Sequence, residues 1–284
     1  MGSGAWLIGD FDAAEFSPAV EWLRERATCT SFGDPRDAIA RGTPRGASLG
    51  LSAHEPAAVV FCAARPGSIS HAQVDALSRA FPLARLMALV GSWCAGEVRS
   101  GRPWPGVPRI DWHRWQTRLP ELMDEIDGAT PVRPPRTMTE VDVLLSSQAQ
   151  ARPPKVAARV AIITDRRVDF ESLCNALSLT TNHCQWLLPD NITPPSPVDV
   201  LLVDATANLG AADEDLNRVR SSLGPLPALV LGHFPRPDEH RDLLAMPRTA
   251  FLAKPYLQRD LLLSLAALLG TLVEQVSSSA SAAA

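Results

Sequence analysis

Short apolar runs alternate with stretches of helical spacing along the first half of the chain. The runs show little polar alternation, which is typical of strands buried on both faces of a parallel sheet. They predict strands at residues 5–10, 27–32, 57–63, 86–91 and 109–115. Apolar residues three or four positions apart predict helices at residues 16–26, 34–39, 70–81 and 119–126. This alternation implies right-handed crossovers and a parallel sheet.

The second half repeats the same plan. Its apolar runs predict strands at residues 157–165, 184–188, 198–204, 227–232 and 250–253. Its helical spacing predicts helices at residues 170–179, 214–223, 238–244 and 257–276. The two halves match in plan and in the position of motifs, so the chain reads as two α/β units of about 120 residues each, an ordinary domain size.

A proline-rich segment separates the two halves. Residues 128–155 carry P-V-R-P-P-R near their start and A-R-P-P-K at their end, a composition typical of a linker. The predicted domains therefore span residues 1–127 and 156–276. The remaining residues, 277–284, are small and polar, and we expect them to form a disordered tail.

Composition narrows the class of protein. Apolar residues make up 46% of the 284 positions, which is enough for packed cores, and a net charge of −4 gives no global basic field for DNA or acidic membranes. The five cysteines form no C-x-x-C pair, a pattern typical of reduced, buried thiols in a cytosolic protein. No signal peptide is recognisable, and the most apolar run is too short to span a bilayer. We therefore expect a cytoplasmic protein without a membrane partner.

Residues 93–118 form a loop rich in tryptophan and arginine. Residues 91–118 hold four of the seven tryptophans and five arginines against one Glu and one Asp. Three interpretations stay open: a protein interface, where Trp and Arg are enriched; a structured loop whose tryptophans cover the sheet edge and pack on arginine stems; and a site for single-stranded nucleic acid, which the sequence favours least. His113 has no partner at metal spacing, so we interpret it as structural.

Two acids and a lysine of the second half fall at the ends of predicted strands. Asp165 ends the first strand, Asp204 ends the third, and Lys254 follows the fifth in F-L-A-K-P. The carboxyl ends of parallel strands meet at one edge, where two carboxylates favour a cation between them, and Mg²⁺ prefers such oxygen ligands. A carboxylate there can attack a phosphoryl group, and a lysine can balance the phosphoryl charge. Alternatively, Asp204 and Lys254 form a buried ion pair, and Asp165 caps the next helix.

The runs V-D-V-L-L-V-D and F-L-A-K-P, with Asp165 ahead of them, resemble the receiver domain of bacterial two-component response regulators. The resemblance covers roughly residues 157–272. It implies an α/β fold of two flavodoxin-like, receiver-type, doubly wound five-stranded parallel sheets in tandem. It also implies phosphorylation at Asp204, phosphate contact by Lys254, and a Mg²⁺ site of Asp165, Asp204 and the backbone carbonyl of Thr206.

Of the other positions in the receiver pattern, one is kept and two are replaced. Phe251 takes the place of the family's aromatic switch residue. Thr164 stands where a receiver usually carries a second acid, and Gly232 stands where it carries a Thr or Ser whose hydroxyl contacts the phosphoryl oxygen. These two departures weaken the resemblance at the site itself.

The first half departs further from the pattern. Asp10 is a lone acid beside Gly9, Cys62 takes the acceptor position, and Gly91 takes the Thr/Ser position. No Lys-Pro follows its last predicted strand. We therefore interpret this half as a degenerate receiver in which Cys62 is a buried structural thiol.

These observations predict a signal-transduction protein rather than an enzyme. The expected partners are a histidine kinase or phosphotransfer protein that phosphorylates Asp204, an unknown downstream protein, and a second copy of the chain bound through helix 257–276, which is apolar almost all round. No effector domain is recognisable. The alternatives are a phosphorylation-independent pseudo-receiver scaffold, a nucleic-acid-binding protein that uses loop 93–118, and an enzyme, which the fold alone does not exclude.

Overall fold

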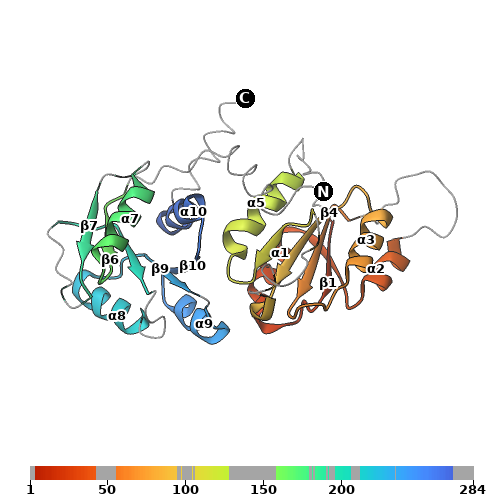
Figure 1. The fold of residues 1–284 in the computed structure, drawn as a ribbon, viewed down its shortest axis with the longest axis horizontal. Helices are drawn as coiled ribbons and strands as arrows, with labels where there is room; N and C mark the ends of the chain where they lie inside the picture. Colours follow the sequence, from red (N-terminus) through yellow and green to blue (C-terminus); the bar gives the residue numbers. More distant parts are fainter. Residues whose placement is uncertain are drawn as a thin grey trace, which may run out of the picture. The chain divides into compact units, whose positions relative to one another are not determined.

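The computed structural model describes most of both halves of the chain. The described residues are 4–42, 56–94, 97, 104, 106–127, 158–178, 181, 183–189, 191, 196–205, 212–233 and 235–270. The predicted linker and the predicted disordered tail lie outside them. The chain divides into two compact units, Met1–Gln150 and Ala151–Ala284, and each contains one sheet (Figure 1).

The first unit is a five-stranded sheet with helices on both faces. Its strands are β1 (Gly4–Gly9), β2 (Thr28–Phe32), β3 (Ala58–Ala63), β4 (Arg85–Val90) and β5 (Arg109–Asp111). Its helices are the 3₁₀ helices η1 (Ala14–Phe16) and η2 (Ser92–Cys94) and the α-helices α1 (Ser17–Arg26), α2 (Pro35–Gly42), α3 (His71–Ala80) and α5 (Trp115–Asp127). All strands are parallel, in the order β2-β1-β3-β4-β5.

The second unit has the same topology. Its strands are β6 (Val160–Ile163), β7 (Cys184–Leu187), β8 (Val200–Asp204), β9 (Ala228–His233) and β10 (Thr249–Lys254). Its helices are α7 (Arg167–Leu177), α8 (Ala212–Leu223), α9 (Pro237–Ala245) and α10 (Gln258–Leu269). The strands are parallel in the order β10-β9-β8-β6-β7, so both sheets have the 2-1-3-4-5 order of flavodoxin-like folds. The predicted fold class is confirmed.

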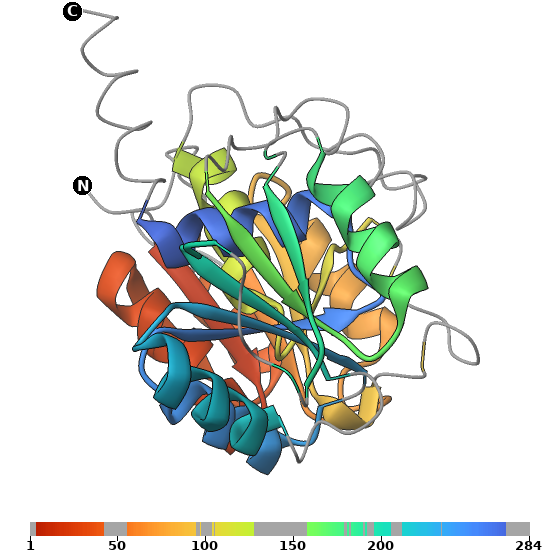
Figure 2. The same cartoon turned by 90° about the vertical axis from the view of Figure 1, so that its left-hand side faces the viewer.

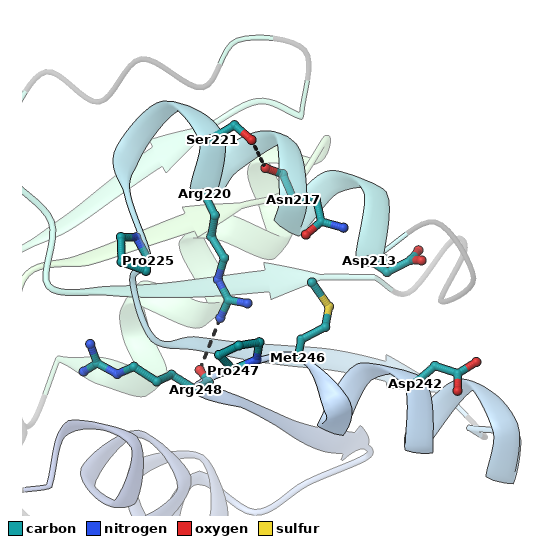
Figure 3. Close-up of a pocket in the computed structure, with 9 residues that line it drawn as sticks. All are labelled: Asp213, Asn217, Arg220, Ser221, Pro225, Asp242, Met246, Pro247 and Arg248. Carbon is teal, nitrogen blue, oxygen red and sulfur yellow. Dashed lines mark hydrogen bonds between the residues drawn. The ribbon is translucent and has the colours of Figure 1, made fainter.

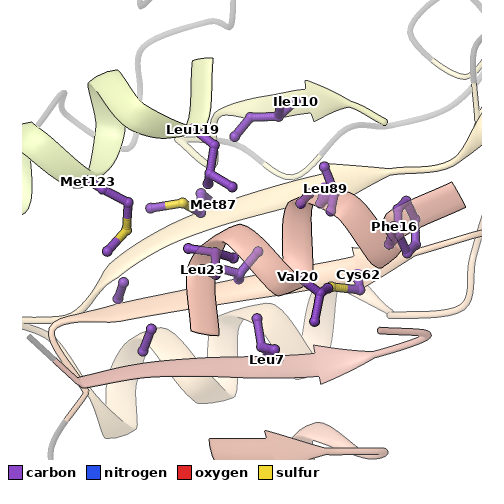
Figure 4. Packing of buried hydrophobic residues seen from close by; sticks show 14 of the residues in the cluster. Leu7, Phe16, Val20, Leu23, Cys62, Met87, Leu89, Ile110, Leu119 and Met123 are labelled. Carbon is purple, nitrogen blue, oxygen red and sulfur yellow. The ribbon is translucent and has the colours of Figure 1, made fainter. Parts of the chain in front are cut away.

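Each sheet is buried between two helical layers. In the first unit, side chains of α1 and α5 pack on one face and side chains of α2 and α3 pack on the other. Figure 4 shows the first of these layers, where Cys62 lies among apolar side chains such as Val20. In the second unit, α7 and α10 cover one face while α8 and α9 cover the other (Figure 2). Double coverage explains why the strands read as continuous apolar runs.

Several predicted boundaries differ from the structure, and the two elements predicted furthest past their observed ends do so for local reasons. The strand predicted at residues 109–115 ends at Asp111, because the N–H of Arg114 donates to the carbonyl of Asp111 at 2.7 Å and turns the chain into α5. The helix predicted at residues 257–276 ends at Leu269, because Gly270 adopts the left-handed conformation at φ 73°.

No helix among the described residues is both long enough and apolar enough to cross a membrane. α10, the most apolar of them, has 12 residues and buries Leu261, Leu262 and Leu265 against the sheet of its own unit.

Candidate functional site

Asp204 and Lys254 meet at the carboxyl edge of the second sheet. Asp204 ends β8 and lies beside Leu231 of β9, while Lys254 ends β10 and lies beside His233 on the other side of β9. The long lysine side chain spans β9 and donates from Nζ to Oδ1 of Asp204 at 2.9 Å and to Oδ2 at 2.8 Å. The structure thus brings together the two residues that the sequence places at the ends of separate strands.

This ion pair is largely removed from water. The Asp204 side chain is 3% exposed and the Lys254 side chain is 18% exposed. A buried carboxylate needs a cation or several hydrogen bonds nearby, and the lysine provides the cation for both oxygens. The peptide bond from Lys254 to Pro255 is cis.

Asp165 follows β6 at the same edge, and its side chain is exposed. Ile163, two residues before Asp165, pairs with Val203, so the ends of β6 and β8 lie side by side. The interpretation of Asp165 as a helix cap is wrong, because α7 has Arg166 at its N-cap and no side-chain capping bond. Thr206, the third predicted metal ligand, lies outside the described residues.

Oxygen atoms suited to a hard cation are present at this edge. Each carboxylate oxygen has two lone pairs, so Asp204 retains acceptor capacity beyond its bonds to Lys254. Within the described part of the chain, no three His, Cys, Asp or Glu side chains converge to hold a metal. Mg²⁺ keeps several water ligands and commonly takes one or two carboxylates, which is the kind of ligand that Asp165 and Asp204 carry.

Tyr256 belongs to this site, although sequence reasoning did not select it. Burial, followed by the negative charges of Asp204 and Asp169, raises the pKa of Tyr256 to about 12. Its position two residues after Lys254 was the available signal. Because Tyr256 is the single tyrosine of the chain, its titration reports on the electrostatics of this edge alone.

We expect Asp204→Asn to lower the pKa of Tyr256, with the value staying above that of a free tyrosine because burial persists. Tyrosinate absorbance measures the titration directly, and Asp238→Asn on α9 is the control that should leave it unchanged. The unfolded chain loses this proton near pH 10. The native protein keeps it to about pH 12, so stability should fall as the pH rises between these values. An unchanged titration in Asp204→Asn would contradict the electrostatic influence of Asp204 on Tyr256.

At the equivalent edge of the first unit, the acceptor position holds a cysteine in place of an aspartate. Cys62 is fully buried, and burial, followed by the charges of Asp10 and Asp12, raises the pKa of its thiol strongly. Asp10 accepts a hydrogen bond at Oδ2 from the N–H of Ala64 at 3.0 Å. The thiol therefore stays protonated and packs in the core, as the sequence interpretation of Cys62 expects.

In the first unit, Glu15 lies beside Gly91, the position at which a receiver carries the hydroxyl of a Thr or Ser. Its Oε2 accepts a hydrogen bond from the N–H of Ser92 at 2.9 Å, across 77 positions of sequence. A Cβ built on Gly91 would overlap Oε1 of Glu15 and lie 2.9 Å from the backbone of Ala64. The carboxylate of Glu15 thus lies directly against Gly91, where a receiver carries its Thr or Ser. Sequence reasoning missed Glu15, because a single acid in A-A-E-F shows no pattern.

The described tryptophans of loop 93–118 divide into a packed group and one exposed residue. Trp104 contacts the Phe61 ring at 5.7 Å, Trp112 is 5% exposed, and Trp115 packs against the core. Trp93, in contrast, is 74% exposed. The packed group supports the interpretation of the loop as a cover of the sheet edge.

The arginines of this loop are also used within the unit. The Arg109 side chain is 5% exposed and bonds Glu97 at 2.9 Å. Arg102 lies outside the described residues. Burial of His113, followed by the positive charge of Arg114, lowers the pKa of His113 to about 3, so this imidazole is neutral at physiological pH.

Comparison with known proteins gives weak likenesses only. No family model matches the chain, and no curated protein is similar to it. A response regulator from Thermotoga maritima is similar in structure at 18% identity and a TM-score of 0.33, over 40% of this chain and 99% of that one. The E. coli RcsC C-terminus, which contains a linker region and a phosphoreceiver domain, is similar at 12% identity and a TM-score of 0.29, over 98% of this chain and 95% of that one. Sequence identities and TM-scores this low say nothing about function. The description of the fold as receiver-like rests on the strand order of the two sheets.

Proposed function

We propose that this chain is a signal-transduction protein with two receiver-like units, of which the second accepts a phosphoryl group on Asp204. The observation that carries the proposal is the Asp204–Lys254 pair at the carboxyl edge of a 2-1-3-4-5 sheet, with Nζ 2.9 and 2.8 Å from the two carboxylate oxygens. Ligand chemistry in open α/β sheets lies at this edge.

The chemistry requires a nucleophile, a charge partner and a donor. One oxygen of Asp204 would attack the phosphorus of a phosphohistidine on a kinase or phosphotransfer protein. The new O–P bond forms an acyl phosphate as the N–P bond breaks, and the imidazole of the donor keeps the bonding electrons and takes up a proton. Lys254 would then move from one carboxylate oxygen to the phosphoryl oxygens, where its charge stabilises the transferred group.

Asp165 and Asp204 are the residues that would hold Mg²⁺, with Thr206 as a further proposed ligand. When bound, the ion would reduce the repulsion between the carboxylate and the incoming phosphoryl oxygens. The protein's own contribution is positional, because the neighbouring ends of β6 and β8 fix the two acids at one edge.

The first unit would act without phosphate. Its acceptor position holds the buried thiol of Cys62, and the side chain of Glu15 fills the space beside Gly91. A partner protein would therefore bind a first unit that does not switch between phosphorylated and unphosphorylated states. The exposed ring of Trp93, next to the Ser92 amide that Glu15 holds, is our candidate contact for that partner.

The experiment is incubation of the full chain with acetyl phosphate and Mg²⁺, followed by intact mass measurement. We expect one added phosphoryl group that hydroxylamine removes, that chelation of Mg²⁺ reduces, and that Asp204→Asn abolishes. Cys62→Ser is the matched control at the equivalent position of the first unit and should leave the mass shift intact. A shift that persists in Asp204→Asn would overturn the assignment.

One observation favours a second function, a phosphorylation-independent pseudo-receiver scaffold. The Asp204 carboxylate is 3% exposed, and Lys254 holds both of its oxygens, so a donor has to displace the lysine before it reaches the acid. In this case acetyl phosphate leaves the mass unchanged, and the ion pair serves only to shape the unit.

Partner contacts are also part of the proposal. α10 buries one side against its own sheet and keeps Leu263, Leu268 and Leu269 partly exposed. Association of two copies through this helix remains our expectation. We propose neither nucleic acid nor a membrane as a partner.

A further inference from the structure

Two cysteines of the second unit lie side by side on one face of its sheet. Cys174 belongs to α7, and Cys184 begins β7. Both side chains pack against the apolar cluster that α7 and α10 form with this face. The thiol of Cys184 donates a hydrogen bond to the sulfur of Cys174. The fold thus brings together two thiols that no C-x-x-C motif links in the sequence.

A neighbouring pair of rings fixes how α7 lies on β7. The rings of Phe170 and Trp186 stack with their centroids 5.7 Å apart and 17° between their planes. The indole N–H of Trp186 also donates to the carbonyl of Thr164 at 2.9 Å, just before α7 begins. These contacts hold the edge strand and the helix in one register.

The same register places the two thiols opposite each other. α7 connects the carboxyl end of β6 to the amino end of the parallel strand β7, so it runs against both strands. Four residues along a helix advance about 6 Å, and two residues along a strand advance about 6.6 Å. The step from Phe170 to Cys174 therefore matches the step from Trp186 back to Cys184. The thiols face each other for the same geometric reason as the rings.

The thiol pair is accessible to small molecules. β7 is the last strand in the order of its sheet, so none of the described strands covers its outer flank. Cys174 and Cys184 are both partly buried, whereas Cys62 and Cys94 of the first unit are buried. Trp186, next to the pair, is 36% exposed.

The hydrogen bond gives the two sulfurs different roles. Burial raises the pKa of Cys174, and the hydrogen bond from Cys184 opposes this rise, while the charge of Glu171 adds to it. Burial, followed by the charge and the hydrogen bond of Cys174, raises the pKa of Cys184 to about 12. Cys174 therefore ionises first. Because the thiolate is the nucleophile and both pKa values are raised, we expect oxidation of this pair to be slow.

We propose that Cys174 and Cys184 form a disulfide when the protein meets a peroxide, and that this crosslink fastens α7 to the edge strand β7. The Cys174 thiolate attacks one oxygen of hydrogen peroxide, the O–O bond breaks, and Cys174 becomes a sulfenic acid as hydroxide leaves and takes up a proton. Cys184 then loses its proton and attacks the sulfenic sulfur, and the S–S bond forms as water leaves. In total, two thiols and one peroxide give one disulfide and two waters. The site is independent of the chemistry proposed for Asp204.

Peptide mapping of the full chain after incubation with hydrogen peroxide tests this proposal. Chymotrypsin cleaves after leucine, and Leu177 and Leu179 lie between the two cysteines, so the digest separates them unless they are linked. We expect two peptides joined through Cys174 and Cys184 that dithiothreitol releases. Two thiols that remain open to alkylation, or linkage of either one to another cysteine, would overturn the proposal.

Met246 provides an internal measure of exposure to the peroxide. It lines a cavity of about 480 Å³ between α8 and α9, on the other face of the same sheet (Figure 3). Its thioether takes up one oxygen atom from the same oxidant. We expect the disulfide to be present once Met246 is fully converted to the sulfoxide. Complete conversion of Met246 without the disulfide would show that peroxide reached the second unit and left the two thiols unlinked.

Variants assign the crosslink and its effect. Cys174→Ser and Cys184→Ser should each abolish it, whereas Cys29→Ser, at a partly buried cysteine of the first unit, should leave it intact. Hydrogen exchange of the α7 peptides should slow when the native chain is oxidised and stay unchanged in Cys184→Ser. A crosslink without slower exchange would contradict the fastening of α7, and equal slowing in Cys184→Ser would show that the disulfide is not its cause.

Discussion

Lys254→Met is expected to lower the free energy of unfolding of the second unit by about 3 kcal/mol, the scale of a buried ion pair that loses one partner. The substitution keeps most of the apolar stem but removes the ammonium that holds both oxygens of Asp204, whose side chain is 3% exposed. Urea unfolding of the full chain measures the loss. Hydrogen exchange of the β8 peptides assigns it to the second unit.

The double variant Lys254→Met/Asp204→Asn should be more stable than Lys254→Met alone, because it no longer buries an uncompensated carboxylate. Arg159→Met is the matched control. It breaks another ion pair of the same unit, between Arg159 and Asp199 at 2.6 Å, but that pair is exposed. Its removal should have little effect on unfolding. Equal losses in Lys254→Met and Arg159→Met would contradict the burial described for the site.

Gly91→Ala is expected to destabilise the first unit by about 2 kcal/mol, the cost of forcing a methyl group into a packed region. The added Cβ would overlap Oε1 of Glu15, which can move, and would lie 2.9 Å from Cα and the carbonyl oxygen of Ala64, which cannot move cheaply. Thermal unfolding of the full chain, with hydrogen exchange of the β4 peptides, gives the size and the place of the effect.

Gly33→Ala is the matched control, because a Cβ at Gly33 meets nothing within 4 Å. It should leave stability unchanged or raise it slightly by restricting the unfolded chain. The combination Glu15→Ala/Gly91→Ala should recover part of the loss, since it removes the flexible obstacle and keeps the backbone contact. A Gly91→Ala variant as stable as the native chain would contradict the close approach of the Ala64 backbone to Gly91.

The fold could be predicted from the sequence because burial on both faces leaves a direct mark. A central strand such as β8 has apolar neighbours above and below it, so its residues form a continuous run. The residues at which strands and helices end were harder to predict, because each end depends on a single local interaction that leaves no trace in the hydrophobic periodicity. The hydrogen bond from Arg114 to Asp111 ended β5, and the left-handed Gly270 ended α10.

The site of the second unit was predictable in part, because Asp204 and Lys254 each end a recognisable strand of a parallel sheet. The role of Glu15 was not, since it depends on a contact across 77 positions between a short helix and the end of β4.

Chemical trapping of the phosphorylated residue tests the central claim most directly. After incubation with acetyl phosphate and Mg²⁺, borohydride reduces an aspartyl phosphate to homoserine, and peptide mass spectrometry locates the product. Our account predicts homoserine at position 204, and aspartate retained at Asp165 and at Asp10 of the first unit. Homoserine at either of those two positions, or its absence from position 204, would contradict the proposal that Asp204 is the phosphoryl acceptor.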